Sequence, residues 1–205
     1  MTDKEKATEE QIFEAASRVF QKDGYAGARM QQIADEANIN KSMLHYYYRS
    51  KEKLFRAVFQ KQLARFFPTI FEVLGSELTL DKKVPRLIDA YYNFLQDNPT
   101  VVQFIIQEMN NHPEEFRRFM KEKNIHPPKS FADQIRKEVE EGNMDPVEPR
   151  QLLISMVGLI LFPFIAQMMV KTVFGLEEQE YLKFLKDRKW FLTDFILNAI
   201  NYKKP

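Results

Sequence analysis

Residues 41–51 carry side chains that can donate hydrogen bonds to a nucleic acid. In a helix that begins at residue 41, the side chains that point away from the apolar positions are those of Lys41, Ser42, His45 and Tyr46. A lysine ammonium can donate to guanine O6 and N7, and a serine hydroxyl can bond a base edge or a phosphate. The hydroxyls of Tyr46 and Tyr47 can donate to phosphates, which fixes the register of a protein on a duplex. The pattern indicates contact with double-stranded DNA.

Positive charge is concentrated in the same segment. Residues 38–56 hold five cationic side chains against Glu52 alone, a local balance of +4 in a chain of net charge +1. Lys51 stands at the start of the next predicted helix, where its charge and the free backbone N–H groups favour a phosphate. A concentrated positive patch of this kind would attract the phosphates of a nucleic acid to one surface. The alternative interpretation is a helix end whose charges only face solvent. The five cationic residues are Lys41, Arg49, Lys51, Lys53 and Arg56.

Two short helices joined by a tight turn would position these side chains. Ile33 and Ala34 supply the apolar and the small residue that two closely crossing helices need at their contact. Asn38 stands at the turn, where a left-handed backbone conformation is expected and asparagine tolerates it. Asn40 can cap the second helix, and Leu44 fills an inward position on it. The spacing predicts a helix-turn-helix, although chance agreement in an amphipathic chain is the alternative. A core role is expected for Tyr48 and partly for Tyr47.

The whole chain repeats apolar residues at helical spacing and shows no competing strand alternation, which predicts an all-α fold. A capping box at residues 8–11 predicts that the first helix begins at Thr8, and Gly24 predicts its end. Ser50 can cap the fourth helix, which Pro68 should kink or end. Two long helices are expected last, over about residues 149–173 and 177–202.

The N-terminal quarter of the chain resembles the TetR family of regulators. The resemblance lies in Gly24-Tyr25, in Ile33-Ala34, and in the runs INKSMLHYYY (residues 39–48) and SKEKLF (50–55). His45 departs from the tyrosine that is usual in the family, and Asn38 replaces the usual glycine of the turn. The resemblance implies DNA contacts by Lys41, Ser42, His45, Tyr46, Tyr47 and Lys51, with Gln31 contributing from the preceding helix.

The resemblance also implies the division of the chain. Residues 1–50 are expected to form a three-helix, helix-turn-helix DNA-binding domain, and residues 51–205 a helical effector-binding and dimerisation domain. The protein would then be a transcriptional regulator, with repression favoured over activation. It would bind a palindromic operator as a homodimer and be released by a small apolar or aromatic effector.

The C-terminal helices carry the expected dimer contact. Residues 151–170 contain no charged side chain, which fits a helix buried by its own domain on one side and by a partner subunit on the other. The alternative is a membrane-anchored helical module that uses residues 151–170 as its span. The dimer stripe expected on the last helix comprises Tyr181, Phe184, Leu185, Leu192, Phe195, Ile196 and Ala199.

An effector pocket is expected beyond residue 70 because the chain holds 18 Phe, 9 Met and 8 Tyr, and such side chains line adaptable apolar cavities. Ordinary core packing is the alternative for each residue. The candidate wall residues are Tyr91, Phe94, Phe104, Gln107, Phe116, Met156 and Phe162, with Gln107 as the polar anchor.

No catalytic or cofactor motif stands out. The chain has no Cys and three scattered His, which excludes a thiolate zinc site and a cysteine nucleophile. His112 with Glu114 and Glu115 could hold a metal, but an exposed polar turn is the preferred interpretation. We therefore expect no enzyme activity, no cofactor, no metal site and no membrane partner. The charged N-terminus shows no signal peptide, and a cytoplasmic location is expected.

Overall fold

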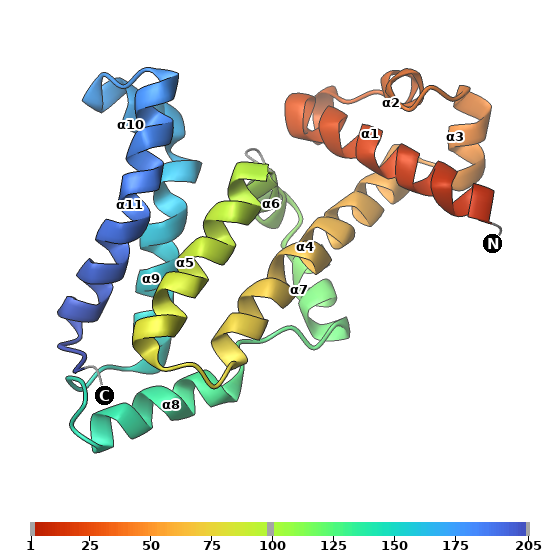
Figure 1. Cartoon of the computed structure of the whole chain (residues 1–205). Coiled ribbons are helices and arrows are strands. Elements are labelled where there is room, and N and C mark those ends of the chain that lie inside the picture. The colour runs from red at the N-terminus through yellow and green to blue at the C-terminus, as the bar shows by residue number, and fades with distance from the viewer. Residues whose placement is uncertain (1–2, 98–100, 204–205) are drawn as a thin grey trace. The chain divides into compact units, whose positions relative to one another are not determined.

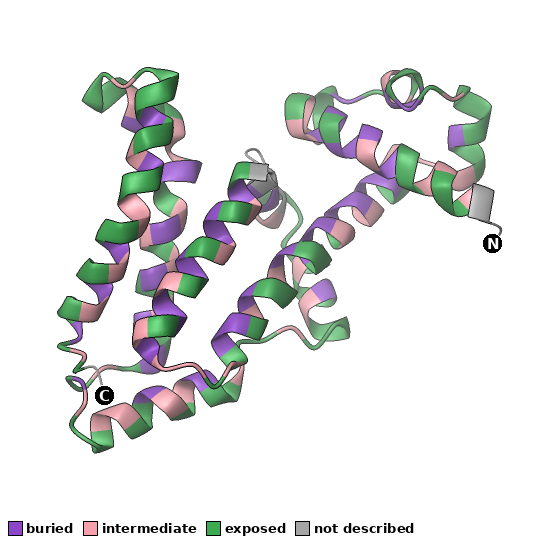
Figure 2. Ribbon diagram, viewed as in Figure 1, coloured by how far each residue is buried: buried purple, intermediate pink, exposed green. Residues whose placement is uncertain are grey.

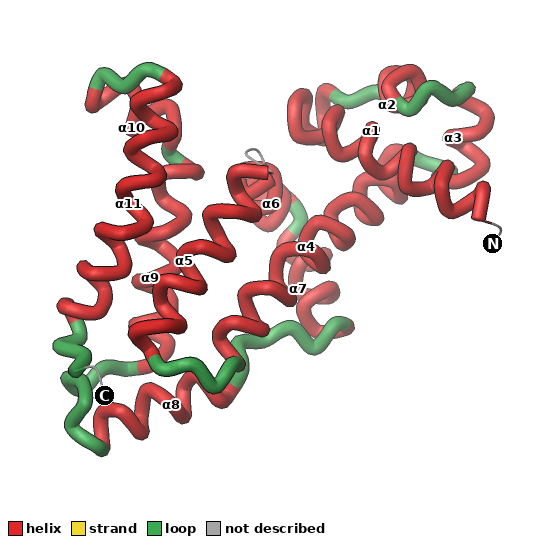
Figure 3. The backbone as a smooth tube through the Cα atoms, in the orientation of Figure 1, coloured by secondary structure: helices red, strands yellow, loops and turns green. Residues whose placement is uncertain are grey.

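The structure is a computed structural model that describes residues 3–97 and 101–203. Helices joined by loops make up these ranges, and no strand occurs within them (Figure 3). The all-α prediction is confirmed. The described residues fall into two compact units, one from residues 1–65 and 100–124 and the other from residues 66–99 and 125–205. The functional boundary expected at residue 50 stays a prediction, since the units are defined by contacts alone.

The first unit contains α1 (Asp3–Gly27), α2 (Met30–Glu36), α3 (Lys41–Tyr47), the first part of α4 (Lys51–Gly75), α6 (Val101–Asn111) and α7 (Pro113–Glu122) (Figure 1). The helix begins at Asp3 rather than at Thr8, so the predicted capping box lies inside the first helix and the predicted start is wrong. Helical hydrogen bonding continues through that position, which a local capping pattern cannot reveal. Gly24 leaves the helical conformation at φ 67°, close to the predicted end.

The second unit contains the last part of α4, α5 (Leu80–Asp97), α8 (Lys129–Glu140), α9 (Pro149–Ile165), α10 (Gln167–Phe174) and α11 (Glu178–Ala199). Figure 1 shows α5, α9 and α11 side by side, in agreement with the contacts between them. Helix α4 continues through Pro68 to Gly75, so Pro68 does not end it.

The predicted long helix over residues 149–173 is wrong, because it breaks at Ala166 into α9 and α10. Two carbonyl groups near the break bond to side chains of α11. Pro163 has no N–H for the carbonyl of Leu159, which accepts instead from Arg188 at 3.2 Å. The carbonyl of Pro163 accepts from the Tyr181 hydroxyl at 2.9 Å. These partners lie far away in the sequence, and no glycine or proline at residue 166 signals the break.

Among the described residues, no single helix has the length and apolar character needed to cross a bilayer. Helices α9 and α10 meet both requirements only as a pair, and they bend by 72° where they join. This bend does not favour residues 151–170 as one straight span.

Candidate nucleic-acid interface

The turn between α2 and α3 has the predicted geometry. Asn38 takes φ 50°, the left-handed conformation that the turn requires. Its neighbours close the end of α2, with the Ile39 N–H donating to the Ala34 carbonyl at 3.0 Å. Asn40 caps α3 by accepting from the Met43 N–H at 2.7 Å. Leu44 is fully buried, as the inward position on α3 was predicted to be.

Side chains of α1 and α2 hold this turn in place. Gln11 of α1 donates to the Ala37 carbonyl at 2.7 Å, directly at the end of α2. Gln32 donates to Asp23 at 2.6 Å, which joins α2 to the end of α1. These hydrogen bonds join α1 to α2 and to the turn that precedes α3. The support under α3 is therefore more rigid than a helix of seven residues would be alone.

The outward side of α3 is open to solvent. Lys41, Ser42, His45 and Tyr46 are all exposed, and Tyr46 keeps 75% of its surface. The Tyr46 and Tyr47 rings meet edge to face at 5.5 Å, and Tyr47 is half-buried. Gln31 is exposed on α2 and donates to Asp35 at 2.8 Å. The structure therefore places five of the seven predicted contact residues on α3 and a sixth, Gln31, on α2.

Tyr48 has the structural role expected for it. It is half-buried, and its hydroxyl donates to Glu9 of α1 at 3.2 Å. Burial, followed by the charge of Glu9, raises the pKa of Tyr48 to about 12. The hydrogen bond fixes the end of α3 against α1.

Lys51, the seventh predicted contact residue, is engaged inside the protein. Its ammonium donates to the carbonyls of Tyr25, Ala26 and Ala28 at 2.8, 3.4 and 3.0 Å. It also lies over the Tyr25 ring at 4.6 Å. A lysine near the last carbonyls of a helix stabilises that end. Sequence reasoning missed this role because it depends on residues more than twenty positions away.

The predicted cationic patch is partly neutralised. Arg56 pairs with Glu52 at 2.6 Å and with Glu115 of α7 at 3.3 Å. Arg49 and Lys53 are exposed beside α3. Met43 also stands on the outward part of α3 with 41% of its surface exposed, and sequence reasoning missed it. Its helical position between Ser42 and Tyr46 was the available signal, and an apolar side chain there suits contact with a thymine methyl group.

The described candidates for the effector wall are divided between the two units. Tyr91 and Met156 are buried in the second unit, whereas Phe162 has half of its surface exposed on α9. Phe116 belongs to the first unit. The side chains of Phe104 and Gln107 lie outside the described residues. Within the second unit, Tyr91 and Phe94 share a neighbour, because both rings contact Phe66, at 5.5 and 5.1 Å.

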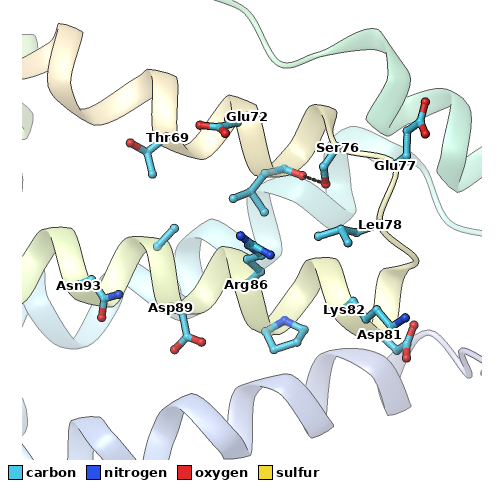
Figure 4. A pocket seen from close by; sticks show the side chains of 13 residues that line it. Thr69, Glu72, Ser76, Glu77, Leu78, Asp81, Lys82, Arg86, Asp89 and Asn93 are labelled. Atoms are coloured by element: carbon cyan, nitrogen blue, oxygen red, sulfur yellow. Dashed lines mark hydrogen bonds between the residues drawn. The ribbon is translucent and has the colours of Figure 1, made fainter.

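A cleft of about 1050 Å³ lies between α4 and α5 in the second unit, and its walls are charged (Figure 4). Glu72 lines it from α4, and Arg86 and Asp89 line it from α5. The Ser76 hydroxyl donates to the Val73 carbonyl at 2.7 Å, at the end of α4. None of the described wall candidates lines this cleft, which is too polar for the expected apolar ligand. No group of three potential metal ligands occurs among the described residues.

The segment that contains the turn between α2 and α3 is similar to known proteins. Residues 12–58 match the family model described as bacterial regulatory proteins, tetR family. The HTH-type transcriptional repressor NicS of Pseudomonas putida is 34% identical over 119 residues, which is 58% of this chain and 49% of NicS. The HTH-type transcriptional repressor SCO4008 of Streptomyces coelicolor is 46% identical over 57 residues, which is 28% of this chain and 30% of SCO4008. The chain thus spans half or less of the length of these two relatives.

The solved structures extend the likeness in fold along nearly the whole chain. A putative transcriptional regulator of Streptomyces coelicolor, SCO4942, superposes with a TM-score of 0.69 at 18% identity and covers 95% of this chain and 99% of its own. At that identity the likeness concerns the fold alone. The matched segment, residues 12–58, contains the turn at Asn38, the cap at Asn40 and the buried Leu44 described above. Through this segment the chain is similar to the tetR family of bacterial regulatory proteins.

Proposed function

We propose that this protein is a sequence-specific DNA-binding transcriptional regulator, in which α3 is the recognition helix. The observation that carries the proposal is the exposed polar side of α3 above a fully buried Leu44 and a fixed turn. A recognition helix must present side chains to the major groove without moving, and its frame supplies that rigidity. The names of NicS and SCO4008 favour repression.

The exposed side chains divide into two kinds of contact. Lys41 and Ser42 stand on the first turn of α3, where side chains of a recognition helix reach base edges. His45 stands one turn further on, within reach of a base or a phosphate. Tyr46 and Tyr47 would donate to phosphates, and Gln31 would add a contact from α2. For Lys51 a phosphate contact stays a prediction, and it would have to coexist with the three carbonyls that its ammonium now bonds.

We also propose that the regulator is a homodimer that pairs through α9 and α11. Most of the stripe predicted on α11 does not face solvent, because Tyr181, Leu185, Leu192 and Ile196 are buried in the same unit, whereas Phe195 of the stripe is exposed. Further apolar residues of the two helices are exposed beside it, and Figure 2 shows exposed positions along α11. The large exposed apolar residues are Ile154, Phe162 and Ile165 on α9 and Leu182, Trp190, Phe191 and Phe195 on α11. Exposed apolar surface of this extent marks a protein contact.

Two-fold pairing would set two copies of α3 about one turn of DNA apart and would demand a palindromic operator. The test is selection of bound duplexes from a random pool by the full-length protein. The proposal predicts an enriched consensus with two inverted half-sites. Enrichment without sequence preference would contradict specific reading, and a single half-site would contradict the dimer.

The proposal also includes release of the protein from the operator by a small apolar or aromatic effector. Tyr91, Phe94 and Phe66 form an aromatic cluster in the second unit that an aromatic ligand could join. A ligand must favour the conformation that binds DNA less well, with a typical coupling of about 1–3 kcal/mol. A thermal-shift screen of neutral aromatic compounds, followed by operator titration with each hit, tests this part. A screen without any stabilising compound would contradict it.

A further inference from the structure

A second pocket, about 310 Å³ in volume, lies within the first unit, away from the outward side of α3. It is formed where the end of α1 and the start of α4 meet the turn between α6 and α7. Its size falls in the range of pockets that hold small molecules, about 300–1,000 Å³. None of the expected effector wall residues whose side chains are described lines this pocket.

Four rings of the described residues line this pocket: Tyr25, Phe55, Phe59 and His112. Tyr25 meets Phe55 edge to face at 4.8 Å and meets His112 at 6.0 Å, nearly perpendicular. Phe55 and Phe59 are almost parallel at 6.4 Å. Rings set at different angles around one space present several π faces to a ligand, which is the arrangement that binds organic cations.

Among the described residues that line the pocket, the charges are unequal in number. Three carboxylates line it, those of Glu52, Glu114 and Glu115, against one described guanidinium, that of Arg56. Arg56 already pairs with Glu52 and Glu115 at 2.6 and 3.3 Å, so it is not available to an anionic ligand.

Two arginines outside the lining also pair with these carboxylates. Arg117 pairs with Glu114, with both side chains more than 70% exposed, and Arg118 approaches Glu115 at 3.8 Å. Pairs so exposed are strongly screened by water. Glu115 itself is only 19% exposed, so water screens its charge less than it screens the charge of Glu114.

We propose that this pocket binds a small organic cation that carries an aromatic ring or a quaternary ammonium group. The rings of Tyr25, Phe55, Phe59 and His112 contact its body, and Glu115 attracts its charge. Because the pocket lies in the first unit, the ligand acts on the helix-turn-helix directly and not through the second unit.

A short path joins the pocket to the recognition helix. The Tyr25 ring lines the pocket, while the Tyr25 carbonyl and ring both contact the Lys51 ammonium. Lys51 begins α4 four residues after α3 ends. A ligand that displaces Tyr25 therefore changes the anchor of the segment that follows α3. This step rests on the proposed DNA-binding function, whereas binding to the pocket does not.

Binding is tested by titration calorimetry of the full-length protein, without DNA, using benzyltrimethylammonium as the probe. Benzyl alcohol is the neutral comparison and phenylacetate the anionic one. We expect saturable binding of one probe per chain, with benzyl alcohol about fivefold or more weaker, since the charge adds a cation–π attraction. Failure of the probe to saturate, or equal binding of either comparison compound, would overturn the proposal.

Four variants locate the site, after their folding is checked by circular dichroism. His112→Ala and Glu115→Gln should each weaken probe binding about threefold or more, whereas His112→Phe keeps a ring and should retain binding. Glu122→Gln changes an exposed carboxylate of α7 outside the pocket and is the matched control. Equal binding by His112→Ala, Glu115→Gln and the control would overturn the assignment to this pocket.

The coupling is tested separately with a selected duplex. The probe should change the dissociation constant for DNA in the parent protein and not in His112→Ala. An unchanged dissociation constant at saturating probe would overturn the coupling. Absence of any specific DNA binding would instead contradict the proposed function, and the calorimetric result would stand on its own.

Discussion

The helix-turn-helix and the helix pair α9–α11 differ in what they show to solvent. In α3 the apolar Leu44 points into the unit, and the outward side is mainly polar, with Lys41 and Ser42 exposed. In α9 both sides are apolar, since Met156 and Ile160 are buried while Ile154 and Phe162 are exposed. A polar outward surface can exchange water for phosphates and base edges, whereas an apolar one is stabilised by another protein surface. The contrast predicts different kinds of partner for the two regions.

The largest effect is expected from the buried side of the helix-turn-helix. Leu44→Ala removes a fully buried side chain from a seven-residue helix and should cost about 2–5 kcal/mol of unfolding free energy. Met43→Ala, at the exposed neighbouring position, should change it by less than about 0.5 kcal/mol. Urea denaturation followed by circular dichroism measures both. Equal effects would show that α3 does not pack as described.

The next effect concerns the apolar outward side of α9. A Cβ added at Gly158 would meet no described side chain and no atom of another helix within 4 Å, so Gly158→Arg should leave the subunit folded. At the centre of a helix pair it should weaken dimerisation by about 2 kcal/mol or more. Sedimentation equilibrium measures the change, with Gln179→Arg on the exposed surface of α11 as the charge-matched control. A Gly158→Arg protein that dimerises like the control would place the contact elsewhere.

Each of the two compact units also contains a lysine that closes a helix end. Lys51 bonds three carbonyls at the end of α1, and Lys83, only 2% exposed, bonds the carbonyls of Leu74 and Ser76 at 2.9 and 2.7 Å. Lys51→Met and Lys83→Met should each cost about 1–3 kcal/mol of unfolding free energy, because buried carbonyls lose their donors. Lys53→Met, at an exposed position, is the control. Equal unfolding free energies of Lys51→Met and Lys53→Met would show that the hydrogen bonds of Lys51 do not stabilise the fold. DNA contact would then be the remaining role for Lys51.

The smallest effect separates two tyrosines. Tyr48→Phe should cost about 1 kcal/mol at pH 7, because it removes the hydrogen bond to Glu9. The Tyr92 hydroxyl is buried and has no hydrogen-bond partner among the residues that the structure describes, so Tyr92→Phe should be neutral or slightly stabilising. Thermal unfolding at pH 7 compares them, and a greater loss in Tyr92→Phe would mean that its hydroxyl has a partner.

The same tyrosines give a dependence on pH. Burial raises the pKa of Tyr92 to about 12, and burial with the charge of Glu9 raises that of Tyr48 to about 12, whereas an unfolded tyrosine titrates near about 10. Their contribution to stability is therefore full below pH of about 10 and is lost as the pH rises through about 12. Tyr92→Phe should lose less stability over this window than the parent. An equal loss would contradict the assignment.

Prediction from the sequence succeeded where the determinants are local. Asn38, Asn40 and Leu44 each occupy the position that turn geometry, capping and helical period require, and the structure confirms all three. Ser50 likewise caps α4 by accepting from the Lys53 N–H at 3.2 Å. These features depend on residues within four positions of one another, which is the range that a sequence pattern describes.

Prediction from the sequence failed where contacts between residues distant in the sequence determine the structure. The break at Ala166 is supported by Tyr181 and Arg188 of another helix, and the bonds of Lys51 end on residues of α1. On α11, periodicity identified apolar positions but not which of them the unit itself would bury. A helix with apolar residues on several sides carries no local signal of which side meets its own core.

The most direct test of the central claim compares the DNA affinity of variants on the outward side of α3 with that of a variant elsewhere on the surface. Lys41→Ala and Tyr46→Phe, with Lys186→Ala on exposed α11 as the control, are titrated with the selected duplex at two salt concentrations. We predict that Lys41→Ala loses about 1–3 kcal/mol of binding free energy. Tyr46→Phe should bind more weakly across sequences, and the control should match the parent. Unchanged affinity in both α3 variants at both salt concentrations would contradict the assignment of α3 as the recognition helix.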